Sequence, residues 1–349
     1  MAISSNAYSP KEFELGIDVE AVSGTVDGTS ALIGVNVDSI SFPTLNPLQV
    51  FDVRSHAGRV AQDVDAFLSN KQTVKEISFS GVLDTQIAPY LLDGIMGSAS
   101  SEPFNPGSGT VAGAYAIPHN YSPTAITYGA SDTGNHLTYT VSVISPASGK
   151  SIALPGMVFT SLTISGDMGE ESGRLKFDAT MQSGMSAAFD DTEAIDTAYG
   201  STYFSLGDTT TARTVAGTVD NLIQSFSLTI ENPANFHGVS GSNFEIISRA
   251  IPEIAVNCDI TMKYDANSLE LDSEFAGAQI TRGLLTQVSD HATITSATAN
   301  KFSFLMNNSV ITNFAFNEGA AMLVDVSLKA LADPSEATAG EKAVLVVKI

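Results

Sequence analysis

Apolar and polar residues alternate along much of this chain, and the clearest alternating stretch covers residues 254–264. Every second residue there is apolar: Ile254, Val256, Cys258, Ile260, Met262 and Tyr264. The residues between them are small, polar or charged: Ala255, Asn257, Asp259, Thr261 and Lys263. Successive side chains of a strand point to opposite faces. The pattern therefore predicts a long strand with one face in a core and the other in water, as in an antiparallel sheet.

The same two-residue period recurs in shorter stretches along the chain. They cover residues 33–37, 77–79, 137–143, 175–181, 226–230 and 322–328. The β-branched run 343–349 predicts a terminal strand. Turn residues such as Gly166–Gly169 and Glu171–Gly173 separate the strand candidates. Many strands with turns between them indicate an all-β fold, mainly an antiparallel sandwich or half-barrel.

One segment, near residues 85–96, has the features of a short flanking α-helix. Asp84 or Thr85 can cap its start, Pro89 falls near its first turn, and Gly97 stands where a C-terminal cap belongs. Apolar residues recur at helical spacing and form one stripe: Ile87, Tyr90, Leu91 and Ile95. The segment 60–68 has a similar stripe, but Gly58 and Asn70 allow a loop there equally well.

Two stretches predict long loops, at about residues 97–127 and 190–218. The first is rich in Ser, Gly, Pro and Ala and poor in charge, and the second is similar with scattered acids. We therefore expect a single domain over residues 1–349 that carries these two insertions. The tetrapeptide Ser-Leu-Thr-Ile occurs twice, at 161–164 and 227–230. Its repetition leaves open an alternative of two similar halves, 1–150 and 151–349.

The chain is acidic throughout its length. Its 349 residues have a formal net charge of −22, with 17 acids and 7 bases in residues 1–174 and 21 acids and 9 bases in residues 175–349. Such an even negative charge disfavours adhesion to nucleic acid or to an anionic membrane. No apolar run approaches the ~20 residues of a membrane-spanning helix, and the first residues show no signal-peptide pattern. We expect a protein without a membrane partner that is not exported through a signal peptide.

No convergent set of catalytic residues is evident. The five histidines, His56, His119, His136, His237 and His291, are widely spaced and show no metal-ligand or catalytic motif. The glycines of Gly238–Gly241 form an ordinary turn, and the single cysteine, Cys258, falls on the apolar side of its strand. We therefore predict a protein that is not an enzyme and has no catalytic, cofactor-binding or metal-binding residues.

Pairs of acids do not change this prediction. Glu170-Glu171 and Asp190-Asp191 are adjacent, so on a strand their side chains would point to opposite faces. Both pairs are better interpreted as solvated turns. Residues 265–270 resemble the start of a calcium loop, but Glu270 stands where an EF-hand requires glycine, so only an irregular calcium site is left open.

Several segments, taken in order, resemble those of bacteriophage tail tube (major tail) proteins. These proteins show a strand like Val74–Gly81, followed by a helix like the one that carries Leu91 and Leu92 and ends at Ile95-Met96-Gly97. The later matching segments are Thr160–Gly166, Gly173–Met181, Ile223–Asn232, Asp259–Asp265 and Leu269–Phe275. The resemblance covers residues 30–97 and 158–330.

The resemblance implies a structural subunit of the virion tail, assembled in the host cytoplasm. Tail tube proteins form rings, usually hexameric, whose inner sheets join into one barrel around a lumen. The rings stack through loops and arms, for which 97–127 and 190–218 are the candidates here. The implied partners are further copies of the chain, the tape measure, tail terminator and distal tail proteins, and DNA passing from capsid to host. An acidic lumen would repel that DNA and keep it mobile.

Two other classes remain open on the sequence. An adhesive or ligand-binding β-sandwich of the virion, such as a decoration or receptor-binding protein, has the same alternating strands. The lack of Trp, and the placement of many of the 18 Phe in strand patterns, disfavour a sugar-binding platform. An acidic β-sandwich hydrolase would need two carboxylates that converge in a cleft.

Overall fold

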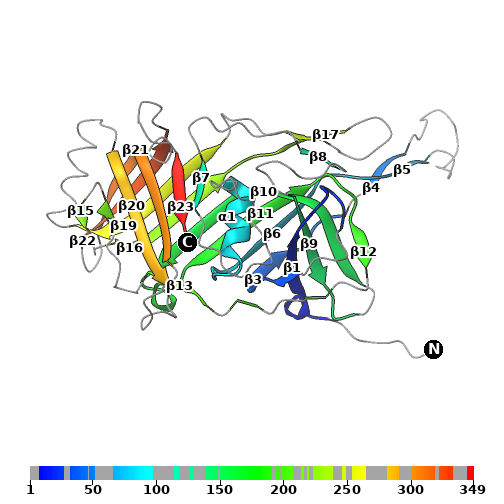
Figure 1. The fold of residues 1–349 in the computed structure, drawn as a ribbon, viewed down its shortest axis with the longest axis horizontal. Coiled ribbons are helices and arrows are strands. Elements are labelled where there is room, and N and C mark those ends of the chain that lie inside the picture. The colour runs from blue at the N-terminus through cyan, green and yellow to red at the C-terminus, as the bar shows by residue number, and fades with distance from the viewer. Residues whose placement is uncertain are drawn as a thin grey trace.

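The structure is a computed structural model. It describes residues 8–26, 32–45, 47–51, 66–96, 114–117, 126–128, 138–147, 150–190, 194–195, 199–200, 202–206, 214–215, 218–219, 223–238, 246–248, 254–264, 281–290, 301–318, 322–332 and 344–349. Strands dominate these residues, and they contain one α-helix (Figure 1). The all-β prediction is therefore confirmed.

The first part of the chain contains twelve strands and α1, Ala88–Met96. The strands are β1 Glu14–Val19, β2 Ile33–Gly34, β3 Val37–Ser41, β4 Pro47–Phe51, β5 Ala66–Gln72, β6 Lys75–Val82, β7 Ala114–Ile117, β8 Ile126–Thr127, β9 Tyr139–Ile144, β10 Ser151–Asp167, β11 Lys176–Ser183 and β12 Ala188–Asp190. Short 3₁₀ turns occur at Pro10–Glu12 and Glu171–Gly173.

The later part contains strands only, among the residues that the structure describes. They are β13 Phe204–Ser205, β14 Thr214–Val215, β15 Thr218–Val219, β16 Ile223–Glu231, β17 Asn235–His237, β18 Ile246–Ser248, β19 Ala255–Lys263, β20 Thr281–Asp290, β21 Lys301–Glu318, β22 Met322–Leu331 and β23 Leu345–Lys348. Most strands of both parts join one barrel-like antiparallel network.

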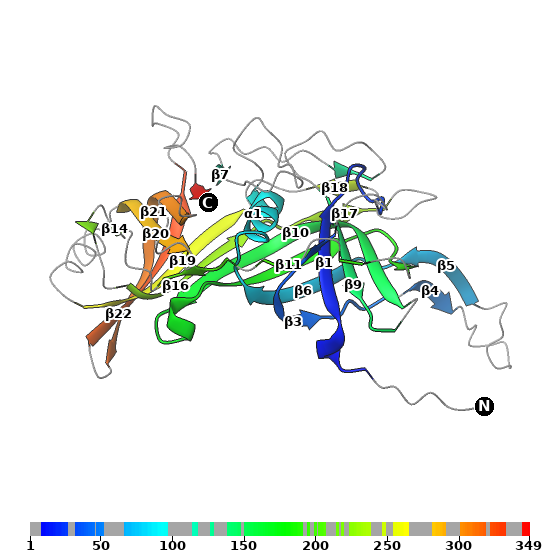
Figure 2. The ribbon, with the colours of Figure 1, turned by 60° about the horizontal axis from the view of Figure 1, so that its bottom comes forward.

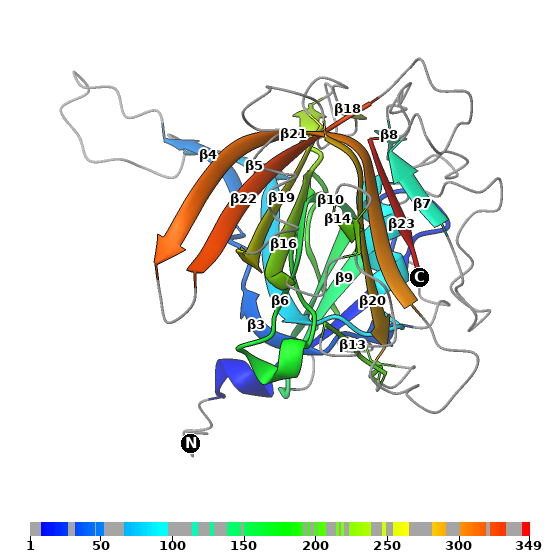
Figure 3. The same cartoon turned by 90° about the vertical axis from the view of Figure 1, so that its left-hand side faces the viewer.

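Eight strands form the central run of this network. Followed from partner to partner, their order is β3–β6–β11–β10–β16–β19–β22–β21, and every pairing is antiparallel. At one end of this run, β21 and β22 form a long curved hairpin (Figure 3). This run places residues 225–231 directly beside residues 161–167, far apart in the sequence.

Shorter strands flank the central run. β9 and β12 pair with the N-terminal part of β10, and β1 pairs with β9. In the same way β20 and β23 pair with the N-terminal part of β21, and β13 and β14 pair with β20. The hairpin β4–β5 extends from one end of the molecule, and β17, β18 and β8 form a separate small sheet (Figure 2).

The core lies on the apolar side of the central run, and α1 is embedded in it. All nine residues of α1 are buried, so the helix has no solvated face. Figure 2 shows α1 against the sheet next to β10. The predicted helix is thus confirmed, but it begins at Ala88 and is buried on every side. Neighbouring elements cover the sides that a single apolar stripe would have left in water.

Three sequence predictions need correction. The stretch 33–37 is two strands, β2 and β3, which pair with β1 and β6 respectively. The possible helix over residues 60–68 is wrong for residues 66–68, which belong to β5. Residues 60–65 lie outside the described residues. The two predicted loops contain short strands, β7 and β8 in the first and β13 and β14 in the second, and the second loop also includes the end of β12 and the start of β15. Much of both loops lies outside the described residues.

The repeated tetrapeptide has a structural meaning that the sequence did not show. Its two copies pair with each other, one on β10 and the other on β16. Thr163 lies opposite Thr229, and their hydroxyl oxygens are 3.1 Å apart. Leu162 lies opposite Ile230, and both side chains are fully buried. The repeat is therefore placed at the middle of the central run.

Candidate functional site

The face of the central run opposite the core is polar along its whole width. The positions that alternation assigns to water, such as Ser78 on β6, Thr180 on β11 and Thr229 on β16, lie on this one face and are only partly buried. Hydroxyl groups bridge neighbouring strands across it: Ser39–Ser80 at 2.8 Å, Ser78–Thr180 at 3.0 Å and Thr163–Thr229 at 3.1 Å. We call this surface the polar face.

The polar face carries more negative than positive charge. Its described acids are Glu76, Asp167, Asp178, Glu231, Asp259 and Asp325. Its described bases are Lys176, Lys263 and Lys329. Asp325 accepts hydrogen bonds from Thr261 at 2.7 Å and from Asn317 at 3.3 Å. A shallow hollow of about 420 Å³ on this face is lined by residues of β16, β19, β21 and β22. The described part of this surface is therefore broad, polar and open to solvent at this hollow.

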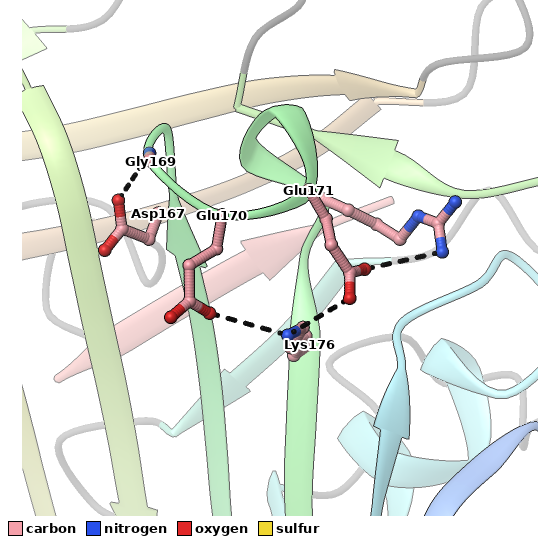
Figure 4. A network of polar contacts seen from close by, with 6 residues as sticks. Asp167, Gly169, Glu170, Glu171 and Lys176 are labelled. Atoms are coloured by element: carbon pink, nitrogen blue, oxygen red, sulfur yellow. Dashed lines mark hydrogen bonds and ion pairs between the residues drawn. The ribbon is translucent and has the colours of Figure 1, made fainter.

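A turn at the margin of this face holds the paired acids that the sequence singled out. Glu170 and Glu171 each lie near the ammonium of Lys176, at 3.6 and 3.5 Å, and Glu171 also pairs with Arg174 at 3.5 Å (Figure 4). The Asp167 carboxylate accepts the backbone N–H of Gly169 at 2.7 Å. Glu171 and then Glu170 raise the pKa of Lys176. Because both glutamates are exposed, the interpretation of this pair as a solvated turn is confirmed. For the other pair it is wrong for Asp190, which ends β12 opposite Ser151.

The edges of the central run present exposed aromatic side chains. Phe42 follows β3 at one end and is 40% exposed. Phe316 lies on β21 at the other end and is 53% exposed, although its ring contacts Tyr264 edge to face. Phe189 on β12 is also exposed. Large apolar side chains gathered at strand edges are typical of surfaces that a further strand covers.

A buried carboxylate, Glu20, joins three segments of the chain behind the apolar side, residues 20–24, 138–140 and the turn at Gly156. Its oxygens accept hydrogen bonds from the hydroxyls of Thr138 and Thr140 at 2.7 and 2.8 Å and from the backbone N–H groups of Gly24 and Gly156 at 2.6 and 2.8 Å. Desolvation raises the pKa of Glu20, and the four hydrogen bonds act against that rise. The residues between the apolar positions of β9 are thus buried, where alternation alone predicted solvent exposure.

A second buried carboxylate, Asp84, caps the start of α1. One of its oxygens accepts the N–H groups of Gln86 and Ile87 at 2.8 and 2.9 Å, and the other accepts the Asn36 amide at 3.2 Å. Burial raises its pKa, and the backbone hydrogen bonds lower it. Of the two caps considered from sequence, Asp84 is therefore the one used. The role of both Asp84 and Glu20 is structural, because each is enclosed by protein groups.

Lys75 is a buried cation at the start of β6. Its side chain is 1% exposed, and its ammonium donates to the carbonyl oxygens of Thr73, at 3.3 Å, and Met185. Burial lowers the pKa of Lys75 to about 8. Sequence reasoning missed Lys75, although a lysine in the same alternating phase as Ile77 and Phe79 is a signal that could have found it.

The pKa of Lys75 predicts a gain in stability at alkaline pH. Between pH 8 and 10.5 the unfolded chain holds a proton that folded Lys75 has lost, so the free energy of unfolding rises with pH. Between pH 7 and pH 10 we expect the free energy of unfolding of the wild type to rise by about 2–3 kcal/mol relative to that of Lys75→Met. Urea unfolding at each pH measures this difference. Lys176→Met, at an exposed site, should show no gain of this sign. An unchanged gap between wild type and Lys75→Met would contradict the prediction.

The other candidate chemical residues are not brought together in the described part of the chain. His237 is exposed and its Nε2 lies 2.8 Å from the Ser248 hydroxyl, while the other four histidines, Asp191 and residues 265–270 lie outside the described residues. Cys258 is buried, and burial raises its pKa. Within the residues described, no cluster of His, Cys, Asp or Glu could hold a metal ion. No described helix is long and apolar enough to cross a membrane.

The described residues form an all-β fold with a broad polar face, exposed aromatic side chains at the two ends of the central run and one embedded helix, and this arrangement fits the class of structural assembly proteins. The comparison with protein families agrees: a family model described as phage tail tube protein matches residues 14–343. The chain therefore belongs to the phage tail tube protein family, which is a family of virion tail structural proteins. No curated protein matches the chain in sequence.

Proposed function

We propose that this chain is the repeating subunit of a tail tube, and that its copies form stacked rings around a channel for DNA. The observation that carries the proposal is the polar face, continuous over eight strands of the central run. Neighbouring subunits would extend this sheet edge to edge, so that the polar faces line the lumen. The edge strands, otherwise a liability for aggregation, would then be paired.

The charge of the polar face supports a passage role over DNA binding. A basic surface would exchange counterions with the phosphates and retain the DNA. The described part of the polar face has twice as many carboxylates as lysines, and hydroxyl groups occupy many of its other positions. Such a wall would repel the phosphates and keep the DNA hydrated. Assembly in the host cytoplasm, rings of six and contacts with tape measure, terminator and distal tail proteins belong to the same proposal.

The purified chain should form rings or hollow tubes under negative-stain electron microscopy. Tubes of Asp178→Lys/Asp259→Lys, which reverses two charges on the polar face, should retain duplex DNA at low salt at least about tenfold better than wild-type tubes and release it at high salt. The control variant Glu12→Lys/Glu170→Lys makes the same change in net charge, but away from the middle of the polar face. Its tubes should retain no more duplex DNA than wild-type tubes.

Either of two results would count against the proposal. A protein that forms neither rings nor tubes would favour the adhesive virion module. Equal DNA retention by the two double variants would show that the polar face does not line the lumen.

A further inference from the structure

The strands of the central run repeat one topology twice. In the first half of the run (the first set) the neighbouring strands are β3–β6–β11–β10, so the last two strands along the chain, β10 and β11, have exchanged places in the sheet. The second half (the second set), β16–β19–β22–β21, shows the same exchange between β21 and β22. A hairpin lies between the first two strands of each set, β4–β5 and then β17–β18. The long third strand of the first set, β10, pairs with β9, which precedes it, and with the short strand β12, which follows β11. The long third strand of the second set, β21, pairs in the same way with β20, which precedes it, and with the short strand β23, which follows β22. The two sets therefore follow the same path.

A β-bulge occurs at the same place in both long strands. The register shifts at Thr160 in β10 and at Thr312 in β21. The hydroxyl of Thr160 donates to the carbonyl of Thr180 at 3.2 Å, and that of Thr312 donates to the carbonyl of Ser327 at 3.1 Å. In each case the acceptor residue lies opposite the residue that follows the bulge. The equivalence thus extends to a particular side-chain hydrogen bond.

A second bulge coincides in the first strand of each set. It falls between Val37 and Ser39 in β3 and between Ile223 and Ser225 in β16. The local sequences are also alike, Val-Asp-Ser-Ile-Ser and Ile-Gln-Ser-Phe-Ser. Bulges are specific features that families of proteins keep, so two coincident bulges in one shared topology indicate duplication.

The join between the two sets shows how such units fit side by side. β10 of the first pairs with β16 of the second, and Ile164 lies opposite Leu228 there. Both side chains are fully buried. Aligning the bulged strands makes Phe316 the equivalent of Ile164 and Phe42 the equivalent of Leu228. Yet Phe316 and Phe42 are 53% and 40% exposed, at opposite ends of the run.

We propose that the chain carries two copies of one tube module, residues 14–190 and 214–348, and that β21 of one chain pairs with β3 of the next chain as β10 pairs with β16 within the chain. The partner is a second copy of this chain. Among the described strands, β3 pairs with β6 alone, and residues 313–318 of β21 pair with β22 alone. The new junction would bury Phe316 against Phe42. This inference rests on the proposed tube function.

The sequence of the β3 edge fits the proposed register. Between β10 and β16 the backbone N–H of Asn232 donates to the carbonyl of Thr160, so this pair of opposite residues is hydrogen-bonded. Hydrogen-bonded and non-hydrogen-bonded pairs alternate along an antiparallel ladder, and the pair Thr163–Thr229 is therefore non-hydrogen-bonded. Pro43 is the equivalent of Thr229. Proline has no N–H to donate, and at this position the neighbouring chain requires none.

Two modules in each chain change the expected composition of a ring. Any closed ring then contains an even number of modules, and each chain supplies eight strands of the wall. A wall of six modules needs three chains in place of six. The module boundary falls between residues 190 and 214, because a boundary at 150 would separate β9 from its partner β10.

A pair of cysteines tests the junction directly. The register places Ser41 of one chain opposite Asn317 of the next, in a pair without backbone hydrogen bonds, where the short Cα separation suits a disulfide. Oxidised Ser41→Cys/Asn317→Cys assemblies should give a covalent ladder that ends at three chains on non-reducing gels. The matched control, Ser41→Cys/Asn313→Cys, moves one cysteine four residues along the same exposed edge and should stay uncrosslinked. The native Cys258 is buried and should not react.

The outcomes separate this inference from the tube function. Tubes without a Ser41→Cys/Asn317→Cys ladder, or an equal ladder from the control, would overturn the junction and leave the tube standing. A ladder without tubes would support the junction and count against the tube. A ladder that ends at six chains would support the edge pairing and overturn the count of three. With neither ladder nor tubes, both proposals fail.

Discussion

Replacing Glu20 by alanine is expected to lower the free energy of unfolding by about 3–5 kcal/mol, because it leaves buried donors without an acceptor. The two hydroxyls and two backbone N–H groups that Glu20 accepts come from β9 and from the turns around Gly24 and Gly156. Glu20 itself is 2% exposed, so water cannot replace it without a rearrangement. Urea unfolding followed by circular dichroism measures the loss.

Two control variants and a pH series make this prediction specific. Glu20→Gln keeps one acceptor oxygen and should fall between wild type and Glu20→Ala, while Glu231→Ala, at an exposed site, should stay within about 0.5 kcal/mol of wild type. The pKa of folded Glu20 is raised, so its contribution is largest below its ordinary pKa and falls as pH rises through the folded value. The gap between wild type and Glu20→Ala should therefore narrow from pH 4 upward. Equal losses for Glu20→Ala and Glu231→Ala would refute the role of Glu20.

Gly94→Ala is expected to destabilise the protein by about 2–3 kcal/mol, against the usual trend for helices. In an exposed helix the same change stabilises by up to about 1 kcal/mol. In α1, however, a Cβ at Gly94 would lie 2.1 Å from a ring carbon of Phe159 and 3.0 Å from a ring carbon of Tyr139. Both rings are fully buried and pack edge to face at 5.3 Å, so neither can move away cheaply.

Gly169→Ala is the matched control for Gly94→Ala. A Cβ at Gly169 would meet only the Asp167 side chain, at 3.2 Å, in an exposed turn. Its effect on the free energy of unfolding should stay within about 0.5 kcal/mol. A gain in stability for Gly94→Ala, measured by the same urea unfolding, would show that α1 is less tightly enclosed than its contacts indicate.

Local pattern was sufficient to predict β6, β9, β11, β16, β19, β22 and β23, but alternation predicted neither of the two longest strands, β10 and β21. β19 has the burial that alternation predicted, with Val256, Cys258, Ile260 and Met262 buried and Asp259 exposed. The helix near residues 85–96 was predicted from its cap and its apolar spacing, and the Asp84 carboxylate does accept the N–H groups of Gln86 and Ile87 in the turn that leads into α1. These features depend on residues close in sequence, which is why a single sequence shows them.

Local pattern was insufficient where distant segments meet. The alternation over residues 137–143 predicted a solvated face of hydroxyl residues, yet Thr138, just before β9, and Thr140 are buried because Glu20, more than a hundred residues away, accepts their hydrogen bonds. The stretch 33–37 read as one strand, but β1 pairs with Ile33 and Gly34 while β6 pairs with the chain from Val37 on. The burial of Lys75 was not predicted, because the ammonium donates to the carbonyl of Met185, which is far away in the sequence, as well as to that of nearby Thr73.

The sequence by itself determined that this is an all-β protein with an acidic, hydroxyl-rich set of outward positions and one short helix. The alternation of side chains along a strand, the residues of a turn and the cap of a helix each depend on residues close together in the chain, so the local sequence specifies them. Only the tertiary structure decided that the two Ser-Leu-Thr-Ile segments pair, that α1 has no solvated face, and that Phe42 and Phe316 end at opposite edges. Strand order and bulge position are set by burial between segments far apart in the chain, where many registers would satisfy the same alternation.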